Sequence, residues 1–148
     1  MAHQPTVFVV DDDSGVRRSL RALGRSHGLT VETYASAQAF MAAYDPDRPG
    51  CLLLDVRLAG RNGLDIQDEL RQRGHALPII VLTGHGDVPT SVRAFRGGAL
   101  DFLEKPVPPR ALVRRIREAL QIDEESRRTG LERESAARRF ARLTPRER

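Results

Sequence analysis

The chain has 148 residues, of which 40% are hydrophobic and 30% are charged, and its formal net charge is +4. These values are typical of one globular domain that buries a sizeable core. No apolar run is long enough to cross a bilayer, and the first residues lack the pattern of a secretory signal. The single cysteine, Cys51, excludes an internal disulfide and a cysteine-based zinc cluster. We therefore expect a cytoplasmic protein without membrane contact.

The 24 basic residues are spread along the chain and do not form the polybasic surface that nucleic-acid-binding domains use. All of them except Lys105 are arginines. We therefore predict that this chain does not itself bind DNA, and we expect a chemical role for its only lysine.

Short apolar runs alternate with segments of helical period along most of the chain. Strands are predicted, in chain order, at 6–10, 29–34, 51–54, 78–82 and 100–103. Helices are predicted between and after them at 14–27, 39–44, 64–73, 87–97 and from 108 or 109 to 120. Ser36 is a candidate N-cap, and Gly28 and Gly74 are candidate helix ends.

This order makes five strand–helix units of similar length. Strands that are apolar throughout are buried on both faces, which is typical of a parallel sheet covered by helices on each side. The sequence therefore predicts an α/β fold with a doubly wound, five-stranded parallel sheet.

From residue 121 onward the apolar residues become sparse and arginine and glutamate dominate. Pairs such as Glu134 and Arg138, four residues apart, favour an exposed helix, which would extend about 35 Å from 121 to 143 if fully formed. No heptad seam continues through this segment, so a coiled coil is not predicted. The alternative is a solvated tail without fixed structure.

Polar side chains follow four of the five predicted strands at the point where each strand ends. They are Asp11, Asp12 and Asp13 after the first strand, Asp55 after the third, Thr83 after the fourth and Lys105 after the fifth. Each alone has a simple structural explanation, such as helix capping or a turn. Because the carboxyl ends of parallel strands meet at one edge of a sheet, their joint occurrence indicates a site.

The chemistry of this set points to a cation and a phosphoryl group. Two carboxylates about 4 Å apart repel by about 4 kcal/mol at an effective dielectric constant near 20, so a bound cation would stabilise them. Oxygen donors without histidine or cysteine suit Mg²⁺. A lysine and a hydroxyl beside them suit a phosphoryl group, and one carboxylate could act as the nucleophile that forms an aspartyl phosphate.

The sequence resembles the receiver domain of two-component response regulators over about residues 5–122. The resemblance rests on Val-Val-Asp11-Asp12-Asp13, Leu-Leu-Leu-Asp55, Leu-Thr83-Gly84 and Glu-Lys105-Pro106, in this order, and Leu-Thr-Gly-His85-Gly-Asp87-Val-Pro89 is similar to the FixJ branch. It implies a flavodoxin-like (CheY-like) fold with strand order 2-1-3-4-5. Residues 144–148 resemble the start of a LuxR-type helix-turn-helix domain, so we expect a helical linker at 123–143 and a missing DNA-binding domain after it.

The resemblance also implies a role for each site residue. Asp55 would accept the phosphoryl group, and Mg²⁺ would be held by Asp11, Asp12, Asp55 and the backbone carbonyl of Arg57. Lys105 would contact the phosphoryl oxygens, and its bond to Pro106 would be cis. Thr83 would turn toward the phosphoryl group on activation, and Phe102 would follow as an aromatic switch.

The implied partners are a sensor histidine kinase as phosphoryl donor and a second copy of the chain. The homodimer would form through the face of the fifth strand and its neighbouring helices, and DNA would be bound only through the missing domain. The protein would thus be a phosphorylation switch that controls transcription and not a turnover enzyme.

Two departures from the family pattern, and two further positions that the family varies, lie near Asp55 and Thr83. Leu58-Ala59 stands where Met-Pro is usual, so we expect a looser loop and Mg²⁺ affinity weaker than submicromolar, which a titration would test. Asn62 replaces a common aspartate before Gly63, which we expect to be neutral. Arg57 and His85 lie where the family tunes the lifetime of the phosphoryl group.

Other functions of the same fold fit the residues less well. A phosphatase of the haloacid-dehalogenase type needs a second carboxylate where Arg57 stands. A flavin or nucleotide module needs a glycine-rich phosphate loop where the three aspartates stand. A receiver that dimerises without phosphorylation would not need Asp12, Asp55, Thr83 and Lys105.

Overall fold

The computed structural model describes residues 4–84 and 86–143, with side chains described up to residue 139. The central sheet contains five parallel strands in the order β2-β1-β3-β6-β7, which confirms the predicted order 2-1-3-4-5. These strands are β1 (Thr6–Val10), β2 (Thr30–Tyr34), β3 (Gly50–Asp55), β6 (Ile79–Thr83) and β7 (Asp101–Glu104). The helices are α1 (Ser14–Ser26), α2 (Ala37–Ala43), α3 (Leu64–Gln72), α4 (Val88–Arg96) and α5 (Pro109–Leu143).

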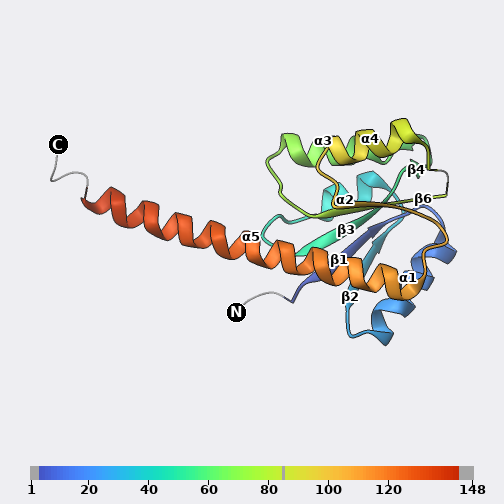
Figure 1. Cartoon of the computed structure of the whole chain (residues 1–148), viewed down its shortest axis with the longest axis horizontal. Helices are drawn as coiled ribbons and strands as arrows, with labels where there is room; N and C mark the ends of the chain where they lie inside the picture. Colours follow the sequence, from blue (N-terminus) through green and yellow to red (C-terminus); the bar gives the residue numbers. More distant parts are fainter. Residues whose placement is uncertain (1–3, 85, 144–148) are drawn as a thin grey trace.

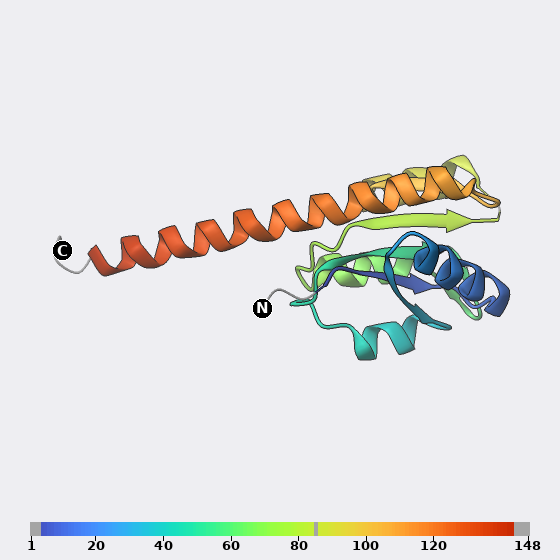
Figure 2. The same ribbon diagram turned by 90° about the horizontal axis from the view of Figure 1, so that it is seen from below.

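Two apolar clusters lie on opposite faces of the sheet (Figures 1 and 2). Because side chains alternate along a strand, Phe8 and Val10 of β1 enter one cluster, whereas Val7 and Val9 enter the other. Helices α2, α3 and α4 cover the first face. Helices α1 and α5 cover the second. The predicted doubly wound arrangement is therefore confirmed.

Polar side chains begin three of the helices. Asp13 caps α1, Ser36 caps α2 and Asp87 caps α4, each accepting hydrogen bonds from backbone N–H groups in the first turn. Gly28 and Gly74, which follow α1 and α3, have φ angles of 69° and 76°, a conformation that favours glycine. The observed ends differ from the predicted ones by two residues or fewer, except that α5 continues past residue 120 to Leu143.

A two-stranded antiparallel ribbon follows β3 and was not predicted. It pairs β4 (Arg57–Leu58) with β5 (Arg61–Asn62), and Gly60 turns between them with a φ of 70°. Two-residue strands leave no periodic pattern in a sequence, so the segment reads only as a loop. The ribbon gives the loop after Asp55 a defined course.

The last helix, α5, is continuous over 35 residues. Its first part packs on the sheet through Leu112, Ile116 and Ala119, and the remainder projects beyond the amino ends of the strands (Figures 1 and 2). A helical continuation is therefore confirmed up to Leu143, and the alternative of an unstructured tail is wrong for this segment. None of the described helices is apolar enough over a sufficient length to cross a membrane.

Candidate functional site

Three carboxylates gather at the carboxyl edge of the sheet. Asp11 directly follows β1, Asp55 ends β3, and the two strands are neighbours in which Val10 is paired with Leu54. Together with Asp12, these residues bring one oxygen each to within 4.8 Å of one another. Asp11 and Asp55 are buried and Asp12 is exposed, so one side of this acidic cluster is open to solvent.

The third member of the aspartate run has a different position. The Asp13 carboxylate accepts hydrogen bonds from the backbone N–H groups of Gly15 at 2.7 Å and Val16 at 3.2 Å, and these bonds lower the pKa of Asp13 below its ordinary value. Asp13 is therefore the N-cap of α1. The run divides into two carboxylates that face the site and one that begins a helix.

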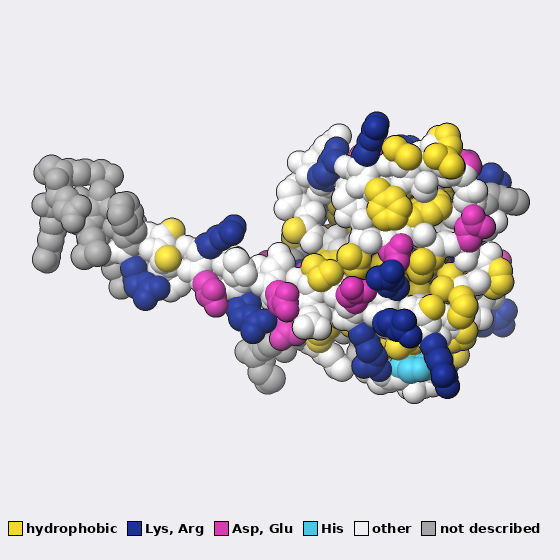
Figure 3. All heavy atoms as spheres, viewed as in Figure 1, with side chains coloured by type: hydrophobic (Ala, Val, Ile, Leu, Met, Phe, Trp, Pro, Cys, Tyr) yellow, Lys and Arg dark blue, Asp and Glu magenta, His cyan; other side chains and the backbone are white. Residues whose placement is uncertain are grey.

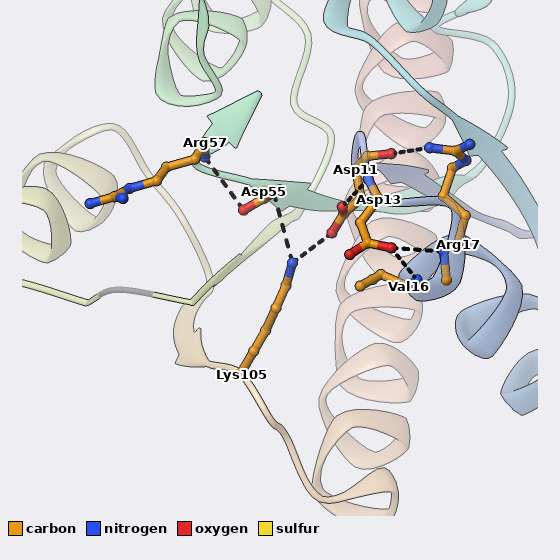
Figure 4. Close-up of polar contacts among 8 residues, drawn as sticks. Asp11, Asp13, Val16, Arg17, Asp55, Arg57 and Lys105 are labelled. Carbon is orange, nitrogen blue, oxygen red and sulfur yellow. Dashed lines mark hydrogen bonds and ion pairs between the residues drawn. The ribbon is translucent and has the colours of Figure 1, made fainter. Parts of the chain in front are cut away.

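Lys105 extends from the end of β7 into the acidic cluster (Figure 4). Its Nζ lies 2.7 Å from Asp11 Oδ2 and 3.7 Å from Asp55 Oδ2. The backbone N–H of Lys105 donates to the carbonyl of Thr83 at 2.8 Å, and the bond between Lys105 and Pro106 is cis. The only lysine thus contacts carboxylates from two other strands.

The environment of Asp55 opposes its negative charge. Burial raises the pKa of the Asp55 carboxyl above its ordinary value; Lys105 acts in the opposite direction, and the negative charge of Asp11 raises the pKa further. The ammonium group of Lys105 therefore does not fully compensate the cost of burying the Asp55 charge. Additional positive charge at this edge would stabilise the ionised Asp55 carboxylate.

The loop after Asp55 is held close to the backbone of β3. The backbone N–H of Arg57 donates to Asp55 Oδ1 at 3.4 Å, whereas its side chain points away from the site (Figure 4). Gly63 N–H donates to the Val56 carbonyl at 2.6 Å. A Cβ at Gly63 would lie 1.9 Å from the backbone oxygen of Asp55, so only glycine allows this approach. Asn62 Oδ1 accepts a bond from Leu64 N–H at 2.8 Å, an acceptor role that aspartate could also fill.

Thr83 and Phe102 lie on the adjacent strands β6 and β7. Thr83 is completely buried at the end of β6, in register with Glu104. Phe102 is partly buried and packs against the apolar cluster under α2, α3 and α4. His85, also expected near the mouth of the site, lies outside the described residues.

The residues at this edge fit a hard divalent cation. The cluster of Asp11, Asp12 and Asp55 offers carboxylate oxygens from two neighbouring strands, and a cation with oxygen ligands such as Mg²⁺ uses one or two carboxylates together with water and a phosphate oxygen. The incompletely compensated charge of Asp55 favours the same occupant. The Arg57 carbonyl belongs to the same loop.

The fold and this edge define a class of protein: a doubly wound α/β domain with an acidic cluster and a lysine at the carboxyl edge of its parallel sheet, where ligand sites of such folds lie. The sequence profile of the response regulator receiver domain matches residues 7–117. The chain therefore belongs to the response regulator receiver family.

Relatives of known name support this assignment. The chain is 45% identical over 141 residues to Nodulation protein W of Bradyrhizobium diazoefficiens, covering 95% of this chain and 62% of that protein. It is 44% identical over 142 residues to the transcriptional regulatory protein FixJ of Azorhizobium caulinodans, covering 96% and 67%, respectively. The chain thus spans about two thirds or less of the length of these two relatives.

Solved structures of the family superimpose well on this chain. The response regulator StyR matches with a TM-score of 0.88 and 41% identity, covering 93% of this chain and 70% of that one. The FixJ-N structure matches with a TM-score of 0.73 and 38% identity, covering 80% and 95%. The StyR structure covers a larger share of this chain than the FixJ-N structure does, so its likeness extends into the part of α5 that projects beyond the sheet.

Proposed function

We propose that the chain is a phosphorylation switch in which Asp55 accepts a phosphoryl group. The observation that carries this proposal is the position of the Asp55 carboxylate, which lies 3.7 Å from Lys105 Nζ and within 4.8 Å of the other carboxylates of the acidic cluster. A nucleophilic oxygen, a cationic side chain and a set of metal ligands are thus brought together at one edge.

The transfer would be a single displacement at phosphorus. An oxygen of ionised Asp55 forms the new P–O bond while the bond between phosphorus and the donor breaks, and the electron pair leaves with the donor. Lys105 would neutralise the negative charge of the phosphoryl oxygens. Mg²⁺, held by Asp11, Asp12, Asp55 and the Arg57 carbonyl, would supply further positive charge.

The response would pass through two adjacent strands. The phosphoryl group of an aspartyl phosphate carries about −1.5 to −2 charges at neutral pH, in place of the single negative charge of the Asp55 carboxylate. It would lie near buried Thr83, whose hydroxyl can donate to a phosphoryl oxygen. Movement of Thr83 would leave space for the partly buried Phe102 of β7. The surface of β7 and its neighbouring helices would then differ between the two states.

The exposed surface beside β7 is suited to a second copy of the chain. Val88, Val92 and Phe95 of α4 are exposed by 74%, 39% and 50%, and apolar side chains gather over α4 on the face shown in Figure 3. Exposed apolar side chains that gather in this way mark an interaction surface. We infer that phosphorylation promotes a homodimer through this surface.

The remaining parts of the proposal concern the whole regulator. We assign residues 5–122 to the receiver domain, 123–143 to a helical linker and 144–148, which lie outside the described residues, to the start of a DNA-binding domain. We place the chain in the cytoplasm, a sensor histidine kinase would be the donor, and transcription would be controlled through that further domain. The names of FixJ and of its matched relatives support this assignment.

The test is the intact mass of the chain after incubation with acetyl phosphate, with and without Mg²⁺. We expect the mass of one added phosphoryl group that requires Mg²⁺ and is lost in Asp55→Asn. The matched control Asp47→Asn removes an exposed carboxylate that precedes β3, at the opposite end of that strand from Asp55, and should still be phosphorylated. Absence of an adduct under every condition would favour a receiver that works without phosphorylation.

A further inference from the structure

A third buried carboxylate, besides Asp11 and Asp55, lies at the end of the sheet opposite the acidic cluster. Asp123 belongs to the part of α5 that leaves the domain, yet only 4% of its surface is exposed. Its neighbours Ile122 and Glu124 are both exposed. A buried carboxylate is costly unless hydrogen bonds and opposite charge compensate it, so its partners at this position are informative.

Asp123 and Arg127 join two successive turns of α5 to the segment that leads into β3. Asp123 Oδ2 accepts a bond from the backbone N–H of Gly50 at 2.9 Å and from Arg127 Nε at 2.8 Å. Arg127 Nη2 donates to the backbone carbonyl of Arg48 at 2.8 Å. We call this set the linker clamp: the side chains of Asp123 and Arg127 and the backbone of Arg48 and Gly50.

The clamp is anchored in the sheet itself. The Arg48 side chain forms an ion pair with Glu32 of β2, donates to Thr6 Oγ1 of β1 at 3.2 Å and lies 5.1 Å from the centre of the Phe8 ring. At Gly50, a Cβ would lie 2.0 Å from the Thr6 carbonyl, so the backbone here is as close to β1 as glycine permits. Through Arg48 and Gly50, α5 is therefore bound to closely packed backbone at the amino ends of β1 and β3.

We call residues 124–143 of α5 the extension. Beyond Arg127, its described side chains make no comparable contacts with the sheet. The described side chains from 128 to 139 are all exposed, and Gly130 lies within the helix, where glycine costs about 1 kcal/mol relative to alanine. The ion pair expected between Glu134 and Arg138 is not formed, whereas Asp123 and Arg127 form one at the same spacing. Among the described residues, Asp123 and Arg127 thus make the last contacts with the sheet.

We propose that the linker clamp is a positioning device that fixes the direction of residues 124–143 relative to the sheet. It joins the extension to the amino ends of β1 and β3, the two strands whose carboxyl ends carry Asp11 and Asp55. The extension therefore moves with the sheet as one body and does not hinge at residue 121. This role is independent of whether Asp55 is phosphorylated.

Hydrogen exchange of the whole 148-residue chain tests the proposal. In Asp123→Asn and in Arg127→Gln, we expect the amides of 122–131 to exchange about tenfold faster or more. Asp123→Asn removes the negative charge that strengthens the bonds from Gly50 and Arg127, and Arg127→Gln removes the guanidinium that donates to Asp123 and to the Arg48 carbonyl. The amides of the sheet should keep their exchange rates, except that of Gly50, which donates directly to Asp123. The matched controls Glu124→Gln and Arg128→Gln change the same charges at exposed neighbours and should behave as the unaltered chain does.

Arg127→Lys is a second, milder variant that separates geometry from charge. Lysine keeps the charge but cannot bind Asp123 and the Arg48 carbonyl together as the planar guanidinium does, so exchange at 122–131 should still increase. Equal exchange in all variants and controls would overturn the proposal. An increase of the same size throughout the sheet would also overturn it, because the two residues would then only stabilise the fold.

Distances measured between spin labels give an independent readout of direction. Labels at Gln38→Cys on α2 and Arg138→Cys on the extension, with Cys51→Ala to remove the native thiol, should give one narrow distance distribution. Adding Asp123→Asn should broaden it, and adding Glu124→Gln should not. A broad distribution before any change in the clamp would contradict a fixed extension.

Discussion

Adjacent residues of identical chemistry have different positions at the acidic cluster. Asp11 is buried against Lys105, Asp12 is exposed, and Asp13 caps α1. These three aspartates are consecutive and chemically identical. Their different environments therefore result only from the direction in which the chain turns after β1. Asp55, by contrast, is the one carboxylate of β3, and its burial makes its charge unfavourable in the folded state.

We expect Asp55→Asn to unfold at a higher Tm than the unaltered chain at pH 7 in EDTA. Burial raises the pKa of Asp55, so the folded state binds this proton more tightly and loses stability as pH rises through the folded-state pKa. Asparagine carries no charge and avoids this loss. The advantage should therefore shrink as pH falls toward the ordinary carboxylate pKa, which thermal unfolding followed by circular dichroism would measure. A lower Tm of the variant at pH 7 would contradict this explanation.

We expect Gly63→Ala to lower the free energy of unfolding by about 1–3 kcal/mol, the usual cost of forcing extra atoms into a packed region. The new Cβ would lie 1.9 Å from the Asp55 carbonyl oxygen, so the loop that carries Arg57 must move and Mg²⁺ affinity should fall as well. Urea unfolding and a Mg²⁺ titration would measure the two effects. Unchanged stability and affinity would show that the loop adapts freely.

At the scale of elements, α5 combines two parts that are held by different interactions. The part up to Leu120 presents an apolar stripe to the sheet, as the helical period predicts. The extension has no such stripe and depends on local helix propensity together with the linker clamp. The ribbon of β4 and β5 is the opposite case. Its sequence has no hydrophobic periodicity, and tertiary contacts give the segment its ordered structure.

We expect Gly130→Ala to strengthen the extension without altering the sheet. A Cβ at this position meets no atom within 4 Å, and alanine favours a helix over glycine by about 1 kcal/mol. Amides around residue 130 should therefore exchange about fivefold more slowly, while the urea midpoint of the sheet stays constant. Faster exchange around residue 130 would indicate that the glycine serves a bend in the helix.

At the scale of the whole molecule, the acidic cluster and the extension of α5 lie at opposite edges of the sheet. The acidic cluster lies at the carboxyl edge of the sheet, and α5 leaves past the amino edge (Figure 1). The exposed apolar side chains of α4 form the surface that we propose for a second copy. In this proposal, a change at Asp55 alters dimerisation without any large movement of the sheet.

We expect acetyl phosphate and Mg²⁺ to convert the chain from monomer to dimer in sedimentation velocity experiments. Val92→Glu places a charge among the exposed apolar residues of α4 and should leave the phosphorylated chain monomeric, because burying an unpaired carboxylate opposes association. The control Leu131→Glu changes an equally apolar side chain on the extension, 64% exposed, and should still dimerise. Dimerisation of Val92→Glu to the same extent would place the interface elsewhere.

The sequence by itself determined the strands, the faces of the helices and the strand ends at which the site residues lie. Apolar period and turn residues are local properties, and burial of both sheet faces leaves few other arrangements for β1, β3 and β6. The polar residues Asp11, Asp55, Thr83 and Lys105 could therefore be assigned to one edge before any distance was known, although the strand order itself came from family resemblance.

Only the tertiary structure decided which of these groups touch. Lys105 and Asp11 are 94 positions apart, and no local pattern shows whether Asp11, Asp12 or Asp13 meets the lysine. Asp123 is likewise indistinguishable in sequence from the exposed acidic residues around it, and it becomes a clamp only because Gly50 and Arg48 lie beside α5 in the folded chain. Contacts between distant segments depend on how the elements pack, and packing is a property of the whole chain.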